Sequence, residues 1–147
     1  MSRRMVWGPT FEEMLHPGKI DPTIREKALA AKEGDPLNEI NLYNITWKRP
    51  DGKPCYIVLP KELTGVDANI IALYGRDFPT GSHKVGATYT VTMEKQLLGE
   101  ITPGEHTLVY PSTGNYGIGG AWVGPRMGYD SVVILPELMS EERFHKI

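Results

Sequence analysis

The sequence lacks several features that would assign it to a class of protein at once. It holds one cysteine, Cys55, which excludes an internal disulfide and fits a reducing cytoplasm. Cys55 lies in a strand-like run, where we expect a buried and unreactive thiol. The longest apolar run, residues 132–135, is far too short to cross a bilayer, and no apolar stretch follows Arg3 and Arg4 as in a signal peptide. We therefore expect a cytoplasmic protein with no membrane association.

An excess of charge of either sign is also missing. The 16 Lys and Arg residues nearly balance the 18 Asp and Glu residues, for a formal net charge of −2. This balance gives no electrostatic reason to expect nucleic acid as a partner. No G-x-G-x-x-G follows a strand-like segment, which argues against a nucleotide-binding Rossmann domain, and no metal site is expected. With 147 residues and 40% apolar content, the chain can form one compact domain with a core.

The first 68 residues are predicted to form an N-terminal arm, a short helix and a β-hairpin, as part of a larger domain. The arm is interrupted by proline and glycine. A helix over 22–33 is bounded by an Asp-Pro start and a glycine stop. Residues 40–47 and 54–59 are rich in β-formers, and the segment 49–53 between them reads R-P-D-G-K. Since Pro-Asp-Gly is a turn signal, these two runs are predicted to pair as a hairpin.

Residues 69–147 show strands alternating with helices, which predicts parallel βαβ units with right-handed crossovers. The last strand is apolar enough to be buried on both faces. The predicted elements are strands at 70–74, 107–110 and 131–135, helices at 83–98 and 115–127, and a last helix that begins at Ser140. The predicted fold class is therefore α/β, an open and mostly parallel sheet with flanking helices, joined to the N-terminal arm and the hairpin.

The helix predicted at 115–127 is intrinsically poor, because it contains Gly119, Gly120, Gly124 and Pro125. We expect tertiary packing to compensate, because glycines would let this helix lie close to its neighbours. Proline inside the last turn is expected to end or kink the helix.

Polar loops follow two of the predicted strands. In an open α/β sheet, ligands bind beyond the carboxyl ends of the strands, and the loops 75–84 and 111–117 both lie at this edge. One helix and one return strand separate Lys84 from Asn115, so neighbouring strands would place the two side by side. Backbone N–H groups at a helix start suit an anion, and the helix dipole disfavours a charged amine at Lys84. From the residues alone, a lysine near glycines is most often a solvated surface group, and both interpretations stay open.

Three motifs in this region resemble those of one enzyme family. Residues 79–84 read P-T-G-S-H-K and resemble the P-x-G-S-x-K segment of fold-type II pyridoxal-phosphate enzymes, whose lysine forms the Schiff base with the cofactor. Residues 112–117 read S-T-G-N-Y-G and resemble the family's S/T-S/T-G-N-x-G loop. Residues 128–143 are similar to the family's next strand and its P-x-x-x-S-x-E-R helix start. The chain thus looks like the N-terminal part of an enzyme of the cysteine synthase, serine dehydratase and tryptophan synthase β family.

The resemblance implies roles for the residues that match the lysine segment and the asparagine. Lys84 would carry pyridoxal phosphate and, once displaced by substrate, would act as the base that moves the α-proton. Asn115 would face the ring hydroxyl of the cofactor. His83 resembles the histidine of the H-K pair in tryptophan synthase β, which lies near the cofactor phosphate. A solvent-facing histidine at a helix start is the open alternative.

The rest of the asparagine loop would hold the substrate. Its hydroxyls and backbone, from Ser112, Thr113 and Gly114, would bind the substrate carboxylate. Tyr116 stands where the family usually has threonine or histidine, so the identity of the amino-acid substrate stays open. The glutamate of the E-T-G-A-G loop of tryptophan synthase has no counterpart, which argues against indole addition.

These roles imply a pyridoxal-phosphate-dependent lyase or transferase that acts on an amino acid with a leaving group at Cβ, such as serine, O-acetylserine or cysteine. Elimination, replacement, and threonine synthase-like or diaminopropionate lyase-like reactions all fit. In the family, the glycine-rich phosphate loop and the partner of the pyridine nitrogen lie beyond the position of residue 147. The C-terminal half or a partner chain would supply them, in a homodimer or a higher assembly. The alternative is a catalytically incomplete α/β module that assembles with or regulates a partner chain.

Overall fold

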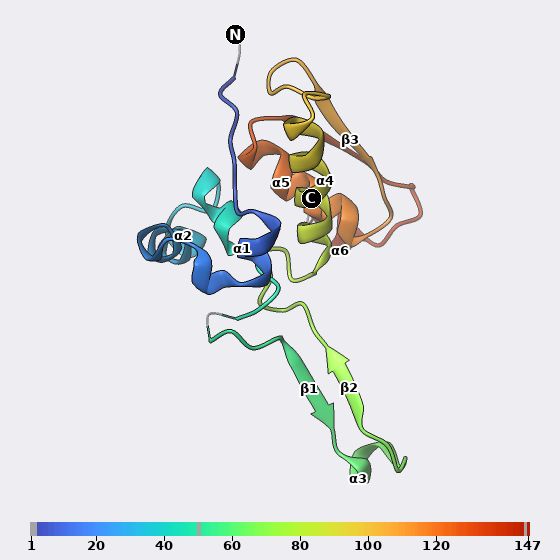
Figure 1. The fold of residues 1–147 in the computed structure, drawn as a ribbon. Coiled ribbons are helices and arrows are strands. Elements are labelled where there is room, and N and C mark those ends of the chain that lie inside the picture. The colour runs from blue at the N-terminus through green and yellow to red at the C-terminus, as the bar shows by residue number, and fades with distance from the viewer. Residues whose placement is uncertain (1–2, 50, 146) are drawn as a thin grey trace.

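The computed structural model describes residues 3–49, 51–145 and 147. Helices from both halves of the chain pack into one body, and a β-hairpin projects from it (Figure 1). The described residues form a mixed α/β fold whose strands pair once in antiparallel and once in parallel. No helix in this part of the chain is long and apolar enough to cross a membrane.

The N-terminal arm leads into short helices. α1 (Phe11–Leu15) begins with a capping box, and the 3₁₀ helix η1 (Pro17–Lys19) follows it. α2 (Pro22–Gly34) begins at Asp21, whose carboxylate accepts backbone hydrogen bonds from the first turn. The helix predicted at 22–33 is confirmed. The arm was expected to be irregular throughout because of its prolines and glycines, so α1 was not predicted.

The prediction of a strand at 40–47 is wrong. This segment contains the 3₁₀ helix η2 (Glu39–Asn44), and its asparagine side chains bond to the backbone. Asn44 Nδ2 donates to Ala28 O at 2.6 Å, and Asn41 Nδ2 donates at 2.8 Å to a carbonyl just after α2. These bonds hold η2 against α2. They offer the backbone an alternative to strand pairing, which the β-forming residues of the segment do not override.

The turn predicted at 49–53 forms without joining two strands. Gly52 N donates to Arg49 O, and Arg49 N donates to Lys53 O, both at 2.9 Å. Gly52 takes a φ of +79°, which glycine adopts without steric cost. Pro50, inside the predicted turn, lies outside the described residues. The hairpin prediction is wrong because η2 stands in place of its first strand.

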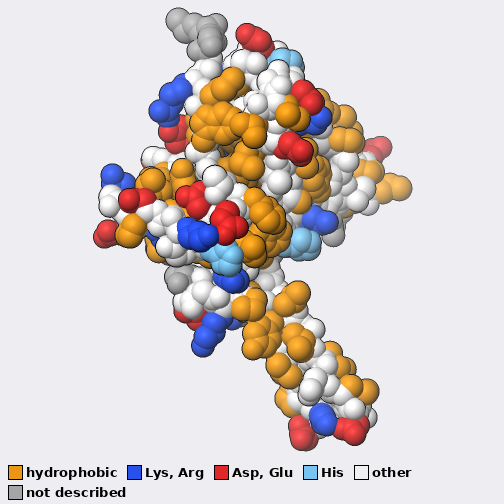
Figure 2. Space-filling model, viewed as in Figure 1, with side chains coloured by type: hydrophobic (Ala, Val, Ile, Leu, Met, Phe, Trp, Pro, Cys, Tyr) orange, Lys and Arg blue, Asp and Glu red, His pale blue; other side chains and the backbone are white. Residues whose placement is uncertain are grey.

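The hairpin that does form joins β1 (Tyr56–Leu59) to β2 (Ile70–Leu73), with the short helix α3 (Lys61–Thr64) between them. The two strands pair antiparallel along their whole length. A strand at 70–74 was therefore predicted correctly, but its expected place in a parallel sheet is wrong. Figure 2 shows hydrophobic side chains along this projecting hairpin and charged side chains at its tip.

Cys55 lies just before β1, in irregular structure rather than inside a strand. Its side chain is half-buried, and Sγ donates to Asp77 Oδ2 at 3.3 Å. The expectation of a buried thiol is therefore wrong. Cys55 lies one residue before β1, at the base of the hairpin, and lines two pockets there.

The second half of the chain contains the predicted βαβ unit. β3 (Thr107–Pro111), α5 (Asn115–Arg126) and β4 (Asp130–Ile134) follow one another, and β3 pairs with β4 in parallel. α4 (Lys84–Leu97) precedes this unit and is followed by a glycine in the left-handed conformation, as predicted. α6 (Glu141–His145) comes last. These helices and strands are confirmed, whereas the open parallel sheet is shown only for this one pair of strands.

The expectation that the last strand is buried on both faces is wrong. Side chains along β4 alternate between exposed and half-buried. Val132 and Ile134 are 48% and 55% exposed, while Val133 lies against α5. One layer of helix covers one face of the β3–β4 pair, and the other face of this pair is open.

The glycines of α5 let it lie close to its neighbours, as predicted. A Cβ at Gly119 would lie 2.7 Å from Thr88 Oγ1 of α4, nearer than real Cβ contacts come. A Cβ at Gly120 would overlap the ring of Tyr110 on β3. The poor helix propensity of this segment is thus offset by packing against α4 on one side and the sheet on the other.

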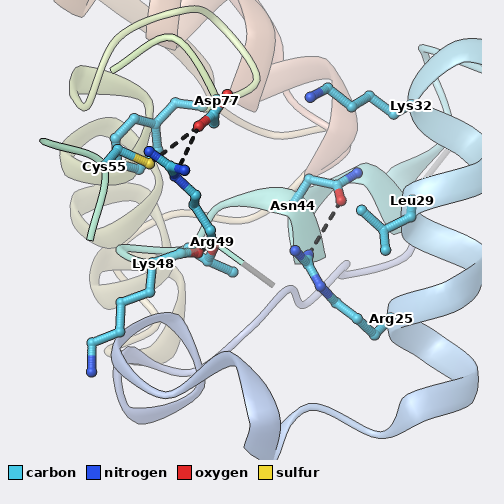
Figure 3. A pocket seen from close by; sticks show the side chains of 10 residues that line it. Arg25, Leu29, Lys32, Asn44, Lys48, Arg49, Cys55 and Asp77 are labelled. Atoms are coloured by element: carbon cyan, nitrogen blue, oxygen red, sulfur yellow. Dashed lines mark hydrogen bonds and ion pairs between the residues drawn. The ribbon is translucent and has the colours of Figure 1, made fainter. Parts of the chain in front are cut away.

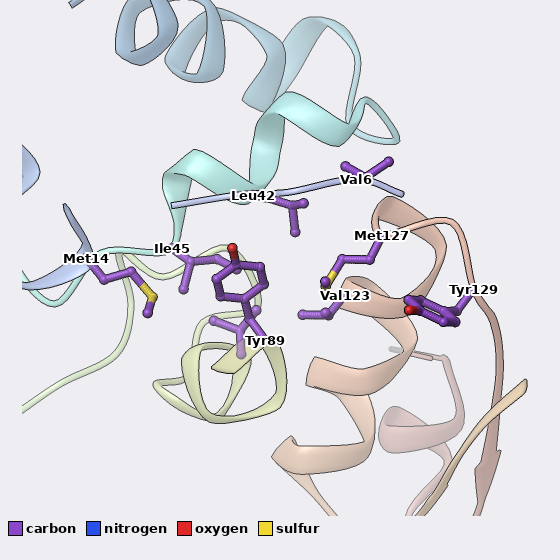
Figure 4. Close-up of a cluster of buried hydrophobic side chains, with 9 residues drawn as sticks. Val6, Met14, Leu42, Ile45, Tyr89, Val123, Met127 and Tyr129 are labelled. Carbon is purple, nitrogen blue, oxygen red and sulfur yellow. The ribbon is translucent and has the colours of Figure 1, made fainter. Parts of the chain in front are cut away.

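A hydrophobic core joins the arm to the second half of the chain. Figure 4 shows side chains from the arm, η2, α4 and α5 pointing toward one another. Tyr89 of α4 is fully buried, its hydroxyl donates to Pro9 O at 2.9 Å, and it accepts from Gly8 N at 3.0 Å. Burial raises the pKa of Tyr89. The core consists of Val6, Met14, Leu42, Ile45, Val85, Tyr89, Val123, Met127 and Tyr129.

Replacing Gly120 with alanine is expected to lower the free energy of unfolding by about 2–3 kcal/mol, because the added methyl group forces the buried Tyr110 ring to move. Urea unfolding followed by circular dichroism measures this change. Gly34 at the end of α2 is the matched control, because a Cβ there meets no atom within 4 Å. Equal stability of both alanine variants would show that α5 does not need the close approach.

Candidate functional site

The first turns of α4 and α5 lie side by side. Thr88 Oγ1 donates to Lys84 O at 2.9 Å and reaches Tyr116 O at 3.4 Å. A Cβ at Gly119 would lie 3.2 Å from Lys84 O, which shows how closely the two backbones approach. The two segments that carry the sequence motifs are thus brought together at the starts of two packed helices. Thr88 was missed in the sequence, although a hydroxyl four residues after Lys84 was the available signal.

The loop before Lys84 is tightly folded. Phe78 N donates to Gly75 O at 3.1 Å, and Gly81 N donates to Phe78 O at 2.8 Å. Gly81 has a φ of +70°, and a Cβ at Gly75 would lie 3.0 Å from Ser82 Cα. Both glycines are therefore required by the shape of this loop. Ser82 Oγ accepts from Lys84 N at 3.3 Å, although the cap position of α4 is held by the next residue, His83.

The loop before Asn115 continues the parallel ladder and then turns into α5. Ser112 N donates to Ile134 O at 3.2 Å, and Ser112 Oγ accepts from Gly114 N at 3.3 Å. A Cβ at Gly117 would lie 2.8 Å from Val133 Cγ1. Glycine at this position lets α5 begin close against β4, which sets the place of Asn115.

The side chains at the two helix starts differ in exposure. Lys84, His83, Thr113 and Asn115 are exposed, whereas Ser112, Gly114 and Tyr116 are half-buried. The Tyr116 ring packs edge-on against the Tyr110 ring, with centroids 5.9 Å apart. Burial raises the pKa of the Tyr110 hydroxyl.

The predicted site residues do not all line one cavity. His83 lines a pocket of about 360 Å³ whose walls include Trp47, Tyr74 and Phe78. Lys84 and Asn115 lie outside the walls of this pocket. The structure therefore gathers the backbones of the two motifs more closely than it gathers their functional side chains.

Curated proteins with related sequences agree with the motifs. In a scan against protein-family models, none matches the chain. Over 85 residues, 58% of this chain, the sequence is 39% identical to cystathionine beta-synthase of Saccharomyces cerevisiae. It is 42% identical over 65 residues, 44% of the chain, to a cysteine synthase of Staphylococcus aureus. It is 32% identical over 92 residues, 63% of the chain, to cysteine synthase 3 of Caenorhabditis elegans.

The matched part of this chain is related to the fold-type II pyridoxal-phosphate enzymes. The matches span 17%, 21% and 27% of the lengths of these three relatives. The chain thus corresponds to a minor part of each of these three relatives, and the activity of the whole protein is a matter for proposal.

The first turns of α4 and α5 begin without a capping bond from the residue at the cap position. His83 and Gly114 occupy the cap positions and make no side-chain capping bond, and Ser82 Oγ, one residue earlier, accepts from Lys84 N. The positive ends of two helix dipoles lie close together here, since Thr88 Oγ1 of α4 reaches Tyr116 O of α5 at 3.4 Å. At the start of α4, Val85 N and Gly86 N donate to Ser82 O and His83 O. Among the described residues, no group of three or more His, Cys, Asp or Glu side chains is placed to hold a metal ion.

Proposed function

We propose that this chain carries the lysine-bearing part of a pyridoxal-phosphate enzyme that performs β-replacement or β-elimination on an amino acid with a leaving group at Cβ. The observation that carries the proposal is the contact through Thr88 between the first turns of α4 and α5. This contact brings Lys84 and Asn115 to adjacent helix starts. The relatives named cysteine synthase and cystathionine beta-synthase support chemistry at Cβ.

The residues at the two helix starts fit the cofactor. Among the described residues, the amine of Lys84 has no hydrogen-bond or ion-pair partner, so it is available to bond to an aldehyde. Asn115 would donate to the ring hydroxyl, and His83 would lie toward the phosphate. When bound, the cofactor supplies an electron sink for the charge left at Cα of the substrate.

The loop before α5 would hold the substrate. Ser112, Thr113 and Gly114 would bind the substrate carboxylate through their hydroxyls and backbone, next to the positive end of the α5 dipole. The Nζ of Lys84, once the substrate amine has taken its place, would accept the proton from Cα. Tyr116 would limit the size of the side chain that fits, because its ring is anchored against Tyr110.

The rest of the site would come from another part of the protein or from a partner chain. The open face of β4 and the placement of Lys84 outside the pocket at His83 both favour a site that forms only when this second part packs against the chain. The same observations support a second candidate, a catalytically incomplete module that regulates the partner chain. We place the division between the N-terminal part and the lysine-bearing part at residues 68 and 69.

Turnover by the assembled protein separates these candidates. With serine, O-acetylserine or cysteine, elimination releases pyruvate and ammonia, whereas replacement in the presence of sulfide or homocysteine forms a new amino acid. Mass spectrometry of the reaction mixture distinguishes the two. The assembled protein is expected to turn over at least one of these substrates. If it binds the cofactor and a partner but turns over none of them, the regulatory candidate replaces the enzyme.

Replacing Asn115 with alanine is expected to slow turnover by about ten- to a hundredfold, because a hydrogen bond to a charged or polarised ring is worth roughly 1.5–3 kcal/mol. The fold is expected to stay intact, since the Asn115 side chain is exposed. Steady-state kinetics measure the loss, and the melting temperature serves as the control for folding. An unchanged rate with an unchanged absorbance spectrum would remove Asn115 from the site.

A further inference from the structure

A second pocket, of about 400 Å³, lies between α2, the segment after η2 and the base of the hairpin. This volume falls in the range of small-molecule sites. Figure 3 shows cationic side chains from separate segments around it. The side chains used below are Arg25, Lys32, Lys48, Arg49, Cys55 and Asp77, and none of them belongs to the site at Lys84.

The fold brings these cations together from distant parts of the sequence. Arg25 and Lys32 are seven residues apart, two turns of α2, and therefore lie on one face of that helix. Lys48 and Arg49 follow η2 and form the opposite side of the pocket. Asp77 comes from the loop after β2. The sequence shows only the short pair Lys48-Arg49, because the approach of this pair to Arg25 and Lys32 is tertiary.

The positive charge of the pocket is only partly neutralised. Its lining contains four cationic side chains and one carboxylate. Asp77 forms an ion pair with Arg49, in which Asp77 Oδ2 lies 3.6 Å from Arg49 Nε. Arg25 instead donates to neutral acceptors, Tyr43 O at 2.6 Å and Asn44 Oδ1 at 3.3 Å.

The remaining cations lack any counter-charge. Burial without a carboxylate lowers the pKa of Arg25. In the part of the chain that the structure describes, the amines of Lys32 and Lys48 have neither a hydrogen bond nor an ion pair. Arg25, Lys32 and Lys48 thus line one cavity and none of them pairs with a carboxylate, in a chain whose formal net charge is −2. Such an arrangement is stabilised by an anion.

We propose that this pocket binds a small polyanion that bears phosphate or carboxylate groups, at a site separate from Lys84. The fork of Arg25 offers paired donors, and Lys32 and Lys48 add two mobile point charges from opposite sides. The pocket shares Cys55 and Phe78 with the pocket lined by His83. We call this cavity the basic pocket. An anion bound in it would contact Phe78, which precedes the segment 79–84 that leads to Lys84.

Cys55 gives a direct readout, because it is the single cysteine of the chain and lines the pocket. Alkylation of Cys55 by iodoacetamide is expected to slow when inorganic pyrophosphate or citrate is added. Isothermal titration is expected to show one site for the more tightly bound anion. Protection by pyrophosphate alone identifies a phosphate ligand, and protection by citrate alone identifies a carboxylate ligand. Lack of protection by either anion at millimolar concentration overturns the proposal.

A pair of double variants separates a built site from general attraction. Lys32→Ser with Lys48→Ser is expected to weaken pyrophosphate binding by about tenfold for each lysine removed. Lys27→Ser with Lys61→Ser removes the same charge from α2 and from the hairpin tip, outside the pocket, and is expected to change binding less than twofold. Equal losses in both double variants overturn the proposal. Lys84→Ala is expected to bind pyrophosphate normally, and loss of binding there overturns the separation of the two sites.

Discussion

Replacing Lys84 with alanine is expected to abolish covalent attachment of pyridoxal phosphate and the visible absorbance that accompanies it. Lys84 begins α4 at the point where this helix meets the first turn of α5. Its amine has no partner among the described residues, whereas Lys19, Lys61 and Lys95 pair with carboxylates. Lys32 and Lys48 are also unpaired, so it is the position of Lys84 at the start of α4 that distinguishes it. A spectrum of the protein with added cofactor, followed by borohydride reduction and peptide mass spectrometry, measures the attachment.

Lys95 is the matched control for this experiment, because it lies on the same helix and pairs with Glu100. The Lys95→Ala variant is expected to keep the colour and the reduced cofactor on Lys84. Exposed salt bridges contribute little to stability, so this variant should also fold normally. Cofactor that remains attached in Lys84→Ala, at another lysine and with a normal rate, would refute the assignment.

The fold was predicted well where local signals and packing agree. The glycine after α4 and the alternation from 107 to 134 specify a βαβ unit, which the parallel pairing of β3 and β4 confirms. The segment 40–47 was misjudged because Asn41 and Asn44 bond to the backbone at a distance in sequence. Strand propensity cannot reveal such bonds, and it also cannot choose the strand with which β1 pairs.

For the candidate site too, one part could be predicted from the sequence and another part could not. The strand pattern predicted that Lys84 and Asn115 lie side by side at the ends of neighbouring parallel strands. Their segments do meet through Thr88, but β2 pairs with β1 and not with β3, so the packing of α4 against α5 brings them together. The roles of the individual side chains stay predictions. The basic pocket could not be found from the sequence, because Arg25 and Lys48 become neighbours only through the packing of α2 against η2.

The described residues on their own are expected to bind the cofactor about a thousandfold more weakly than the assembled protein, because several charge-assisted bonds to the phosphate are absent. Two of the relatives are about five and six times as long as the stretch they share with this chain, so the remaining donors would come from outside it. Fluorescence titration with pyridoxal phosphate measures the affinity. Co-expression with the part of the protein that corresponds to the rest of the relatives is expected to restore tight binding.

The same residues on their own are also expected to self-associate, because apolar side chains lie open on two strand pairs. Val109, Val132 and Ile134 are each about half exposed on one face of β3 and β4. A two-stranded hairpin is marginally stable in water by itself, so β1 and β2 would also gain from being covered. Sedimentation velocity over a range of concentrations measures the association.

A charge placed on the open face of β3 and β4 tests whether this face, rather than exposed apolar side chains in general, causes the self-association. Val132→Lys is expected to reduce self-association and to block assembly with the partner, because a lysine there resists burial against an apolar surface. Leu138→Lys introduces the same charge at an apolar side chain that is 99% exposed outside the sheet, and is expected to change neither. Yellow, monodisperse and active monomers of the unaltered chain would show that the open face of β4 needs no partner and that the site is complete within these residues.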